Sequence, residues 1–199
     1  MDSGYNIFDD FDIGDDDLRL MQKYVRLGPE HSKFMKMVNV SWDITAPQYW
    51  WKEMNSYTAK TVRDPYSITH KITNEEFTLD DFSIEKLYKE SLLGIQSVIT
   101  TLNLWRKAYL AEKDVTTKNN IWYQIIQLLP SSYNECATIQ LNYAELYNIY
   151  HAQKELNNIP ENHRLDEWYI FCEWVKALPL GKELICGFDV VVPDSKMDF

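Results

Sequence analysis

Cationic, hydroxyl-bearing and aromatic side chains are concentrated between residues 50 and 71, in the stretch WWKEMNSYTAKTVRDPYSITHK. Cations form charge-assisted bonds with phosphate oxygens, hydroxyl groups orient a phosphate, and an aromatic face stacks on a nucleobase. A nucleotide-sized anionic ligand uses all three kinds of group. The stretch therefore predicts a ligand-binding set made of stacking faces, hydroxyl donors and cations: Trp51, Ser56, Tyr57, Thr58, Arg63, Tyr66, His70 and Lys71. Loops of this composition also occur on surfaces that bind nothing, so the pattern by itself leaves an ordinary surface loop open.

Signatures of catalysis are absent from the sequence. It contains no GxGxxG, no P-loop, no GxSxG and no HExxH. The four histidines, at positions 31, 70, 151 and 163, form no HxH or HxxxH pair, which disfavours a metal site. The acidic start of the chain lacks the glycine and the terminal glutamate of a calcium loop. From the residues alone we predict no catalytic residues and no metal site.

The charge of the chain is unevenly distributed. The formal net charge is −10, and residues 1–17 hold seven aspartates and no lysine or arginine. Because no basic stripe is present to bind a phosphate backbone, an extended nucleic acid is disfavoured as a partner. Three cysteines without CxxC spacing favour free thiols in a reducing compartment. The start of the chain does not resemble a secretory signal, and no run of about 18 apolar residues occurs, so we expect a cytoplasmic protein without a membrane partner.

Hydrophobic periodicity predicts the elements that hold these residues. The alternating stretch VNVSWDITA (38–46) is typical of a half-buried strand, and Pro47 suits the start of a helix on which Trp50 and Met54 share a face. Spacings of three and four predict one long helix over residues 84–111. The other predicted elements are a helix at 15–28 that stops at Gly28, a loop at 63–71, a helix at 117–128, a strand at 135–141, and helices at 142–154 and 163–178. We predict an α+β fold, a small antiparallel sheet flanked by long helices, with an acidic segment at 1–14 before a single domain at 15–199.

Three segments, in order, resemble the flavin-dependent thymidylate synthase (ThyX) family. GPEHSKFMKMVNVSWDITAPQYWWKEMNSYTAKTVRDPYSITHKI (28–72) is similar to the family's Gly-His-Glu, strand, Ala-Pro helix start, Arg-His-Arg motif and Ser-rich loop. LLPSSYNECATIQLNYAEL (128–146) resembles its Leu-Pro, short strand and Asn-Ala-Arg-x-Leu helix start, and HRLDEW (163–168) resembles its His-Ala-Gln-Trp-Glu stretch. The resemblance implies a ThyX-like fold and a homotetramer with nucleotide pockets between subunits. In an active member it also implies FAD and dUMP.

The side chains that carry the family's chemistry differ here. The Arg-His-Arg positions fall on Ser56, Tyr57 and Thr58, and other family arginines fall on or near uncharged residues: Ile126, Ala144 and Gln153. ThyX enzymes use these arginines to clamp flavin and nucleotide phosphates through bidentate bonds. The family's uracil-binding glutamate falls near Asp64, and Asn142 stands unchanged. The resemblance therefore adds Asp64 and Asn142 to the ligand-binding set.

Three functions are compatible with this pattern. We predict first a pseudoenzyme that binds a nucleotide without a cofactor, for example a phage protein that sequesters a nucleotide signal in its host's cytoplasm. The alternative is a divergent FAD-dependent synthase that methylates dUMP, with phosphates held by relocated cations such as Lys52 and Lys60. A second alternative is a structural or protein-interaction module. If Arg63 holds a phosphate, Arg63→Ala is predicted to weaken binding by about 1.5–3 kcal/mol while leaving thermal stability nearly unchanged, because a loop arginine is seldom structural.

Overall fold

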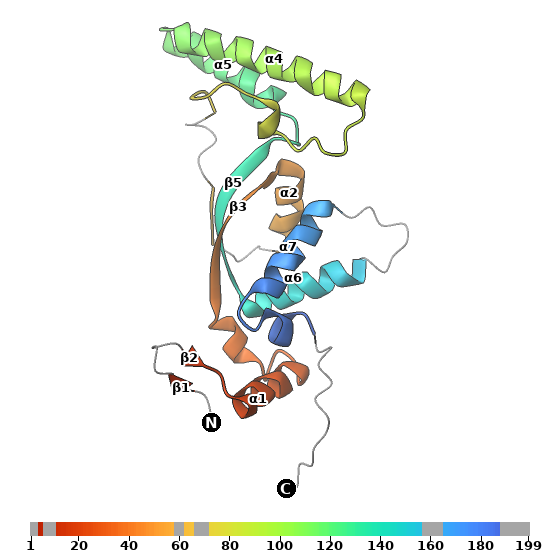
Figure 1. Cartoon of the computed structure of the whole chain (residues 1–199). Helices are drawn as coiled ribbons and strands as arrows, with labels where there is room; N and C mark the ends of the chain where they lie inside the picture. The colour runs from red at the N-terminus through yellow and green to blue at the C-terminus, as the bar shows by residue number, and fades with distance from the viewer. Residues whose placement is uncertain (1–3, 6–10, 58–61, 66–71, 157–164, 188–199) are drawn as a thin grey trace. The chain divides into compact units, whose positions relative to one another are not determined.

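The protein has an α+β fold, as predicted, with a small three-stranded antiparallel sheet and α-helices of ten residues or more (Figure 1). The computed structural model describes all residues except 1–3, 6–10, 58–61, 66–71, 157–164 and 188–199. In chain order the elements, with η marking short 3-10 or π turns, are β1 (Gly4–Tyr5), β2 (Phe11–Asp12), α1 (Asp15–Arg26), η1 (Lys33–Lys36), β3 (Asn39–Pro47), α2 (Gln48–Tyr57), β4 (Val62–Pro65), η2 (Leu79–Asp81), α4 (Lys89–Ala111), α5 (Val115–Leu128), β5 (Asn134–Asn142), α6 (Tyr143–Leu156), α7 (Asp166–Ala177) and η3 (Gly181–Ile185).

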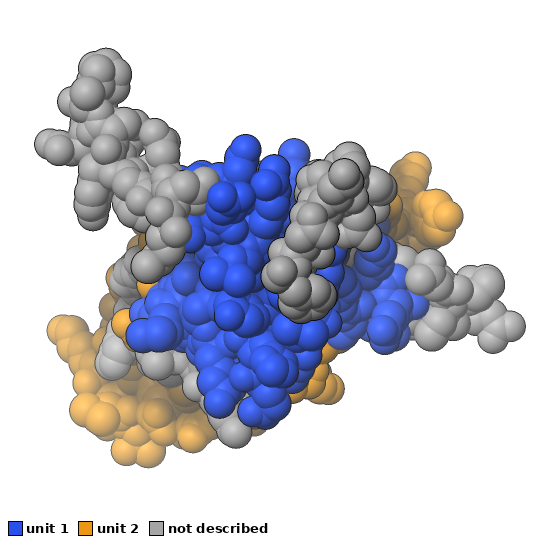
Figure 2. Space-filling view, turned by 90° about the horizontal axis from the view of Figure 1, so that it is seen from below, with its two compact units in different colours: residues 1–40, 140–199 blue, residues 41–139 orange. Residues whose placement is uncertain are grey.

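The chain divides into two compact units (Figure 2). Unit 1 contains residues 1–40 and 140–199, and unit 2 contains residues 41–139. The sequence-based division into an acidic segment and one domain stays a prediction. Among the described residues no helix is both long and apolar enough to span a membrane.

The sheet has the strand order β3-β5-β4. In β3 the buried Ile44 and Ala46 alternate with the exposed Asp43 and Thr45, which confirms the alternating pattern seen in the sequence. The hydroxyl of Thr138 on β5 donates to the Asp43 carboxylate at 2.5 Å. One face of β3 is therefore apolar, and the other carries a polar link to its neighbouring strand.

The core of unit 2 is formed by the inner faces of α4 and α5 together with the segment that precedes α4. Ile72, Phe77, Phe82, Leu102 and Ile125 are buried together there, and Figure 1 shows α4 and α5 side by side. Burying such side chains stabilises the unit by roughly 1.5–3 kcal/mol for each large residue, before entropy is counted.

Helix α4 begins at Lys89, five residues later than the periodicity predicted. The preceding residues are held by tertiary contacts instead. Phe82 forms an isolated antiparallel bridge with Tyr133, and the backbone N–H of Ser83 donates to the Ser132 carbonyl at 2.9 Å. The Ser83 hydroxyl also donates to the Asn134 side chain at 2.9 Å. These non-local bonds override the local helical pattern.

The core of unit 1 is formed by the inner faces of α6 and α7, together with η3. Its fully buried residues include Leu146 and Ile149 on α6, Trp168 and Val175 on α7, and Ile185 on η3. The approach of η3 to α7 needs a glycine, because a Cβ on Gly181 would lie 2.2 Å from the Val175 carbonyl oxygen. The predicted helix at 163–178 is present from Asp166, and positions 163 and 164 lie outside the described residues.

Candidate functional site

Helix α2 positions the tryptophan pair from which the predicted site was built. Its first two backbone N–H groups, at Gln48 and Tyr49, donate to the carbonyls of Tyr133 and Ser131 at 3.0 and 3.1 Å. These bonds satisfy donors that a helix start leaves without partners, and they tie α2 to the segment before β5. Trp50 and Trp51 are both buried, with exposed fractions of 1% and 2%. Both rings therefore belong to the core.

Trp51 is held on two sides within unit 2. Its indole Nε1–H donates to the backbone carbonyl of Glu135 at 3.0 Å. The guanidinium of Arg63 lies over its ring, with Cζ 4.1 Å from the ring centroid, which is the geometry of a cation–π contact. The face of Trp51 that was predicted to stack on a base is thus in contact with an arginine.

Arg63 connects three elements. It comes from β4, a segment that the sequence analysis expected to be loop, and its Nη2 lies 3.2 Å from Oε2 of Glu135 on β5. Its Nη1 donates to Oδ1 of Asn55 on α2 at 3.3 Å. The Arg63 and Glu135 side chains are 22% and 15% exposed, and Arg63 Nε is buried without a hydrogen-bond partner in the described structure. The ion pair is therefore shielded from most solvent, and a further acceptor at Nε would complete the bonding of the guanidinium.

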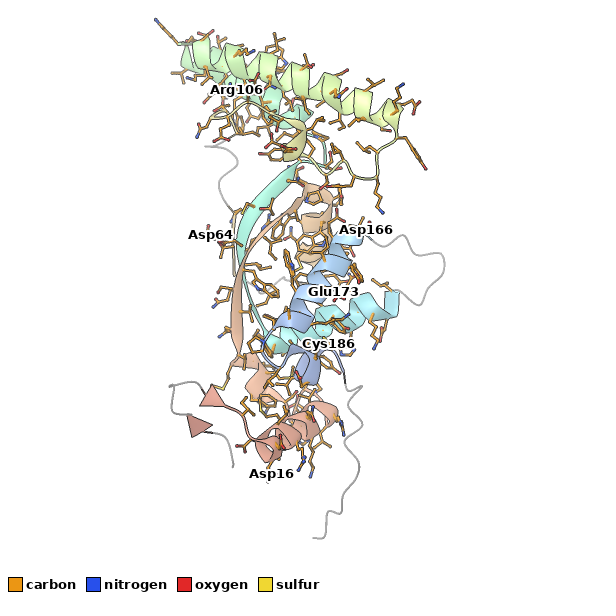
Figure 3. All side chains as sticks on the ribbon, viewed as in Figure 1. Asp16, Asp64, Arg106, Asp166, Glu173 and Cys186 are labelled. Atoms are coloured by element: carbon orange, nitrogen blue, oxygen red, sulfur yellow. The ribbon has the colours of Figure 1, made fainter. Side chains whose placement is uncertain are left out.

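The remaining predicted residues of α2 and β4 lie at or near the surface. The Ser56 hydroxyl donates to the Glu53 carbonyl within the last turn of α2, at 2.6 Å, and Tyr57 is half-buried. Asp64 is exposed, and Figure 3 labels its side chain beside the strands. Four other predicted residues lie outside the described residues: Thr58, Tyr66, His70 and Lys71. The structure thus brings Trp51, Asn55, Arg63 and Glu135 together.

Asn142 belongs to unit 1, where it caps helix α6. Its Oδ1 accepts from the backbone N–H of Glu145 at 3.0 Å, while the Glu145 carboxylate accepts from the backbone N–H of Asn142 at 2.9 Å. This reciprocal arrangement is a capping box, and it satisfies two backbone donors. The Asn142 side-chain amide group keeps its donors, so the cap and a ligand contact can coexist.

Glu135 and Asn55, which bond to Arg63, were not predicted from the sequence as site residues. A glutamate at the start of a short strand has no distinctive local pattern, and the two partners of the ion pair lie 72 positions apart. The charge of Glu135 also contributes to raising the pKa of the Tyr133 hydroxyl, after burial and the charge of Asp81. Burial and these two charges thus favour the neutral form of the Tyr133 hydroxyl.

Unit 1 contains a separate group of titratable side chains. Burial, helped by the charge of Cys186, raises the pKa of Tyr150 to about 12, and burial raises the pKa of the Cys186 thiol. Figure 3 labels Glu173 and Cys186, and the Glu173 carboxylate accepts from Lys176 at 2.6 Å. The raised pKa favours the protonated thiol of Cys186, which is a poor nucleophile.

A surface depression of about 570 Å³ adjoins this group and is lined by Glu173, Lys176, Ala177, Leu178, Leu180, Lys182 and Glu183. Its two lysines and two glutamates balance each other in formal charge. Within the described part of the chain, no three His, Cys, Asp or Glu side chains are grouped to hold a metal ion.

Comparison with solved structures identifies the fold. A crystal structure of ThyX from Helicobacter pylori with FAD and dUMP aligns with a TM-score of 0.55 and 16% sequence identity, over 87% of this chain and 83% of that chain. A second ThyX structure from Helicobacter pylori, also complexed with FAD and dUMP, aligns with a TM-score of 0.54 and 16% identity, over 87% and 82% of the two chains. A scan of protein-family models and a search of curated proteins both find no match.

The class that these observations define is the ThyX-like α+β fold, as the sequence resemblance implied. At 16% identity the likeness establishes the fold alone.

Proposed function

We propose that the protein is a non-catalytic nucleotide-binding protein on a ThyX-like fold. The observation that carries the proposal is the composition of the last turn of α2 and of β4. Where the ThyX motif has two arginines and a histidine, the described residues are Ser56 and Tyr57, and the following arginine, Arg63, is bonded to Glu135 and stacked on Trp51. A phosphate clamp made of arginines needs guanidinium groups whose bonds are directed at the ligand.

Nucleotide binding is supported by the fold and by the groups that remain. The two aligned ThyX structures hold FAD and dUMP. Around the end of α2 this chain keeps hydroxyl groups, the partly exposed edge of Arg63 and the exposed Asp64. Such groups can hold a nucleotide with modest affinity, whereas fast transfer chemistry also needs several charges fixed around the reacting atoms. We therefore propose sequestration of a nucleotide rather than its turnover.

We also propose that the protein is a homo-oligomer, most simply a tetramer, that acts in the cytoplasm. The long α4 helix supports assembly because it carries exposed leucines, among them Leu93 and Leu104, on a face that does not contribute to the core.

Native mass spectrometry of the purified protein tests nucleotide binding. We expect a co-purified nucleotide, or, after its removal, calorimetric binding of at least one member of a panel of mono-, di- and cyclic nucleotides. A panel without any binder contradicts the proposal and leaves the structural or interaction module. Absorbance in the flavin region, together with consumption of dUMP when folate and reductant are supplied, supports the flavin-dependent synthase instead.

A further inference from the structure

Arg63, Trp51 and Glu135 form a closed ring of contacts within unit 2. Arg63 lies on the Trp51 ring, Trp51 donates to the Glu135 backbone, and the Glu135 carboxylate meets Arg63. The three residues come from β4, α2 and β5. The ring holds the guanidinium in one orientation, with Nη1 directed to Asn55 and Nη2 to Glu135.

The Glu135 carboxylate occupies the place that an anionic ligand group would take on this guanidinium. In the described structure it does so through one pair of atoms, Oε2 and Nη2, at 3.2 Å. Strong arginine–oxyanion pairs are shorter, about 2.7–2.9 Å, and commonly use two parallel bonds. Arg63 Nε is buried without a partner, so a second oxygen beside it would gain a hydrogen bond that Glu135 does not make.

Exchange of the carboxylate for a ligand needs little rearrangement. The backbone of Glu135 is fixed by Trp51, while its carboxylate can turn away by side-chain rotation alone. The Arg63 side chain is 22% exposed, so an incoming oxyanion meets the exposed part of the guanidinium first, and it reaches the buried Nε only once the Glu135 carboxylate has turned away.

We propose that Glu135 is a specificity-determining residue, an internal anion that competes with the phosphate of a ligand for Arg63. The inference rests on the proposed function for the identity of the ligand, a nucleotide, but the competition itself concerns any phosphate-like oxyanion. Glu135 acts in two ways. It must release Arg63 before the phosphate binds, and its displaced negative charge then repels the phosphate. The result is a site whose affinity for phosphate groups is lower than Arg63 would give without this competitor.

Glu135→Gln tests the proposal, because glutamine has nearly the same shape and still accepts a bond from Arg63 without carrying the charge. The measurement is calorimetric titration with dUMP, inorganic pyrophosphate and uridine at low salt. We expect Glu135→Gln to bind dUMP and pyrophosphate about tenfold more tightly than the wild type, and uridine equally. The gain shrinks in 0.5 M salt, because salt screens the partly exposed charges. Equal or weaker binding of pyrophosphate by Glu135→Gln overturns the proposal.

Glu76→Gln is the matched control. It removes one negative charge from the same unit at an exposed pair, Glu76 with Lys107 at 3.8 Å, and should leave all three affinities unchanged. If Glu76→Gln also binds dUMP and pyrophosphate about tenfold more tightly, the gain in affinity comes from the change in net charge, and the proposed role of Glu135 is overturned. If Glu135→Gln does not fold by circular dichroism, Glu135→Asp replaces it. Aspartate retracts the carboxylate by one methylene and should also bind pyrophosphate more tightly than the wild type, whereas unchanged binding contradicts the proposal.

Pyrophosphate separates this inference from the proposed function. Tighter pyrophosphate binding by Glu135→Gln, without binding of dUMP or any other nucleotide, supports the competition at Arg63 and contradicts nucleotide binding. Nucleotide binding that is equal in the wild type and Glu135→Gln supports the proposed function and overturns the role of Glu135.

Discussion

The guanidinium of Arg63 contributes to the stability of unit 2 because it contacts two other elements. It meets Trp51 and Asn55 on α2 and Glu135 on β5, and it is itself part of β4. From the sequence, Arg63 was predicted to be a loop residue whose removal leaves thermal stability nearly unchanged. The structure changes that expectation, since a half-buried ion pair that loses one partner leaves the other charge poorly solvated.

Arg63→Ala should therefore lower the free energy of unfolding by about 2 kcal/mol, because the cation–π contact is lost and the charge of the mostly buried Glu135 is left uncompensated. Urea unfolding followed by circular dichroism measures the change. Lys107→Ala is the control, because it breaks a pair in the same unit whose side chains are 71% and 60% exposed, and it should cost no more than about 0.5 kcal/mol. Equal effects of the two substitutions contradict a structural role for Arg63.

Tyr150 links the stability of unit 1 to alkaline pH. Burial raises its pKa to about 12, whereas an unfolded tyrosine ionises near pH 10. Between these values the folded protein binds more protons than the unfolded chain. The stabilising contribution is thus complete below pH 10 and is lost as the pH rises toward 12.

We expect the urea midpoint to fall between pH 10 and 12, and Tyr150→Phe to make that fall less steep, because phenylalanine does not ionise. Urea titrations at several pH values measure the slope. Tyr169→Phe, on the exposed face of α7, is the control and should preserve the wild-type slope. A wild-type slope in Tyr150→Phe would show that this hydroxyl is not the group responsible.

At the scale of single elements, the start of α6 gives Asn142 a capping role beside the ligand contact that was predicted for it. Asn142 caps the helix through its carbonyl oxygen, and the predicted ligand contact uses its amide group. The two roles can be separated, because aspartate keeps the capping oxygen and removes the amide donors.

Asn142→Asp should retain the wild-type free energy of unfolding, whereas Asn142→Ala should lose about 1 kcal/mol of it with the cap. Urea unfolding gives both values. Calorimetry with the nucleotide found for the wild type then tests the ligand contact. Weaker binding by both variants supports that contact, and unchanged binding by Asn142→Asp removes Asn142 from the ligand-binding set.

The elements also show how far the sequence could predict the fold. β3, α5 and β5 were predicted to within two residues at each end, because their patterns arise from residues that are neighbours in the chain. β4 was missed since a four-residue strand at 62–65 exists through its pairing with β5. Helix α4 starts late for a similar reason, the bridge between Phe82 and Tyr133. Both differences between prediction and structure thus arise from contacts between residues that are far apart in the sequence.

Contacts between residues distant in the sequence also shape the candidate site. Residue types predicted Trp51 and Arg63 as members of one site, and the structure places them in contact at 4.1 Å. The sequence could not indicate that they contact each other rather than a ligand, because Glu135, which holds Arg63 in place, lies in another strand. A ligand-binding role for both stays a prediction.

At the scale of the whole molecule, the outer face of α4 is the feature that points to assembly. Leu93 and Leu104 are 56% and 64% exposed, and their spacing of eleven residues places them on one side of the helix. The buried Leu102 lies on the opposite side, so α4 presents apolar residues both to its own core and to solvent. Large apolar side chains repeated on an exposed helix face are typical of an interface.

Leu104→Glu is therefore expected to shift the protein from an oligomer toward the monomer mass of 23.6 kDa, because a buried charge without a partner strongly disfavours an apolar interface. Multi-angle light scattering at micromolar concentration measures the mass. Gln127→Glu adds the same charge at an exposed position of α5 and should keep the wild-type mass. A wild-type mass of 23.6 kDa contradicts assembly altogether, while an oligomer that survives Leu104→Glu places the interface on another surface. Because circular dichroism of Leu104→Glu should match the wild type, a lower mass with an unchanged spectrum separates lost assembly from lost folding.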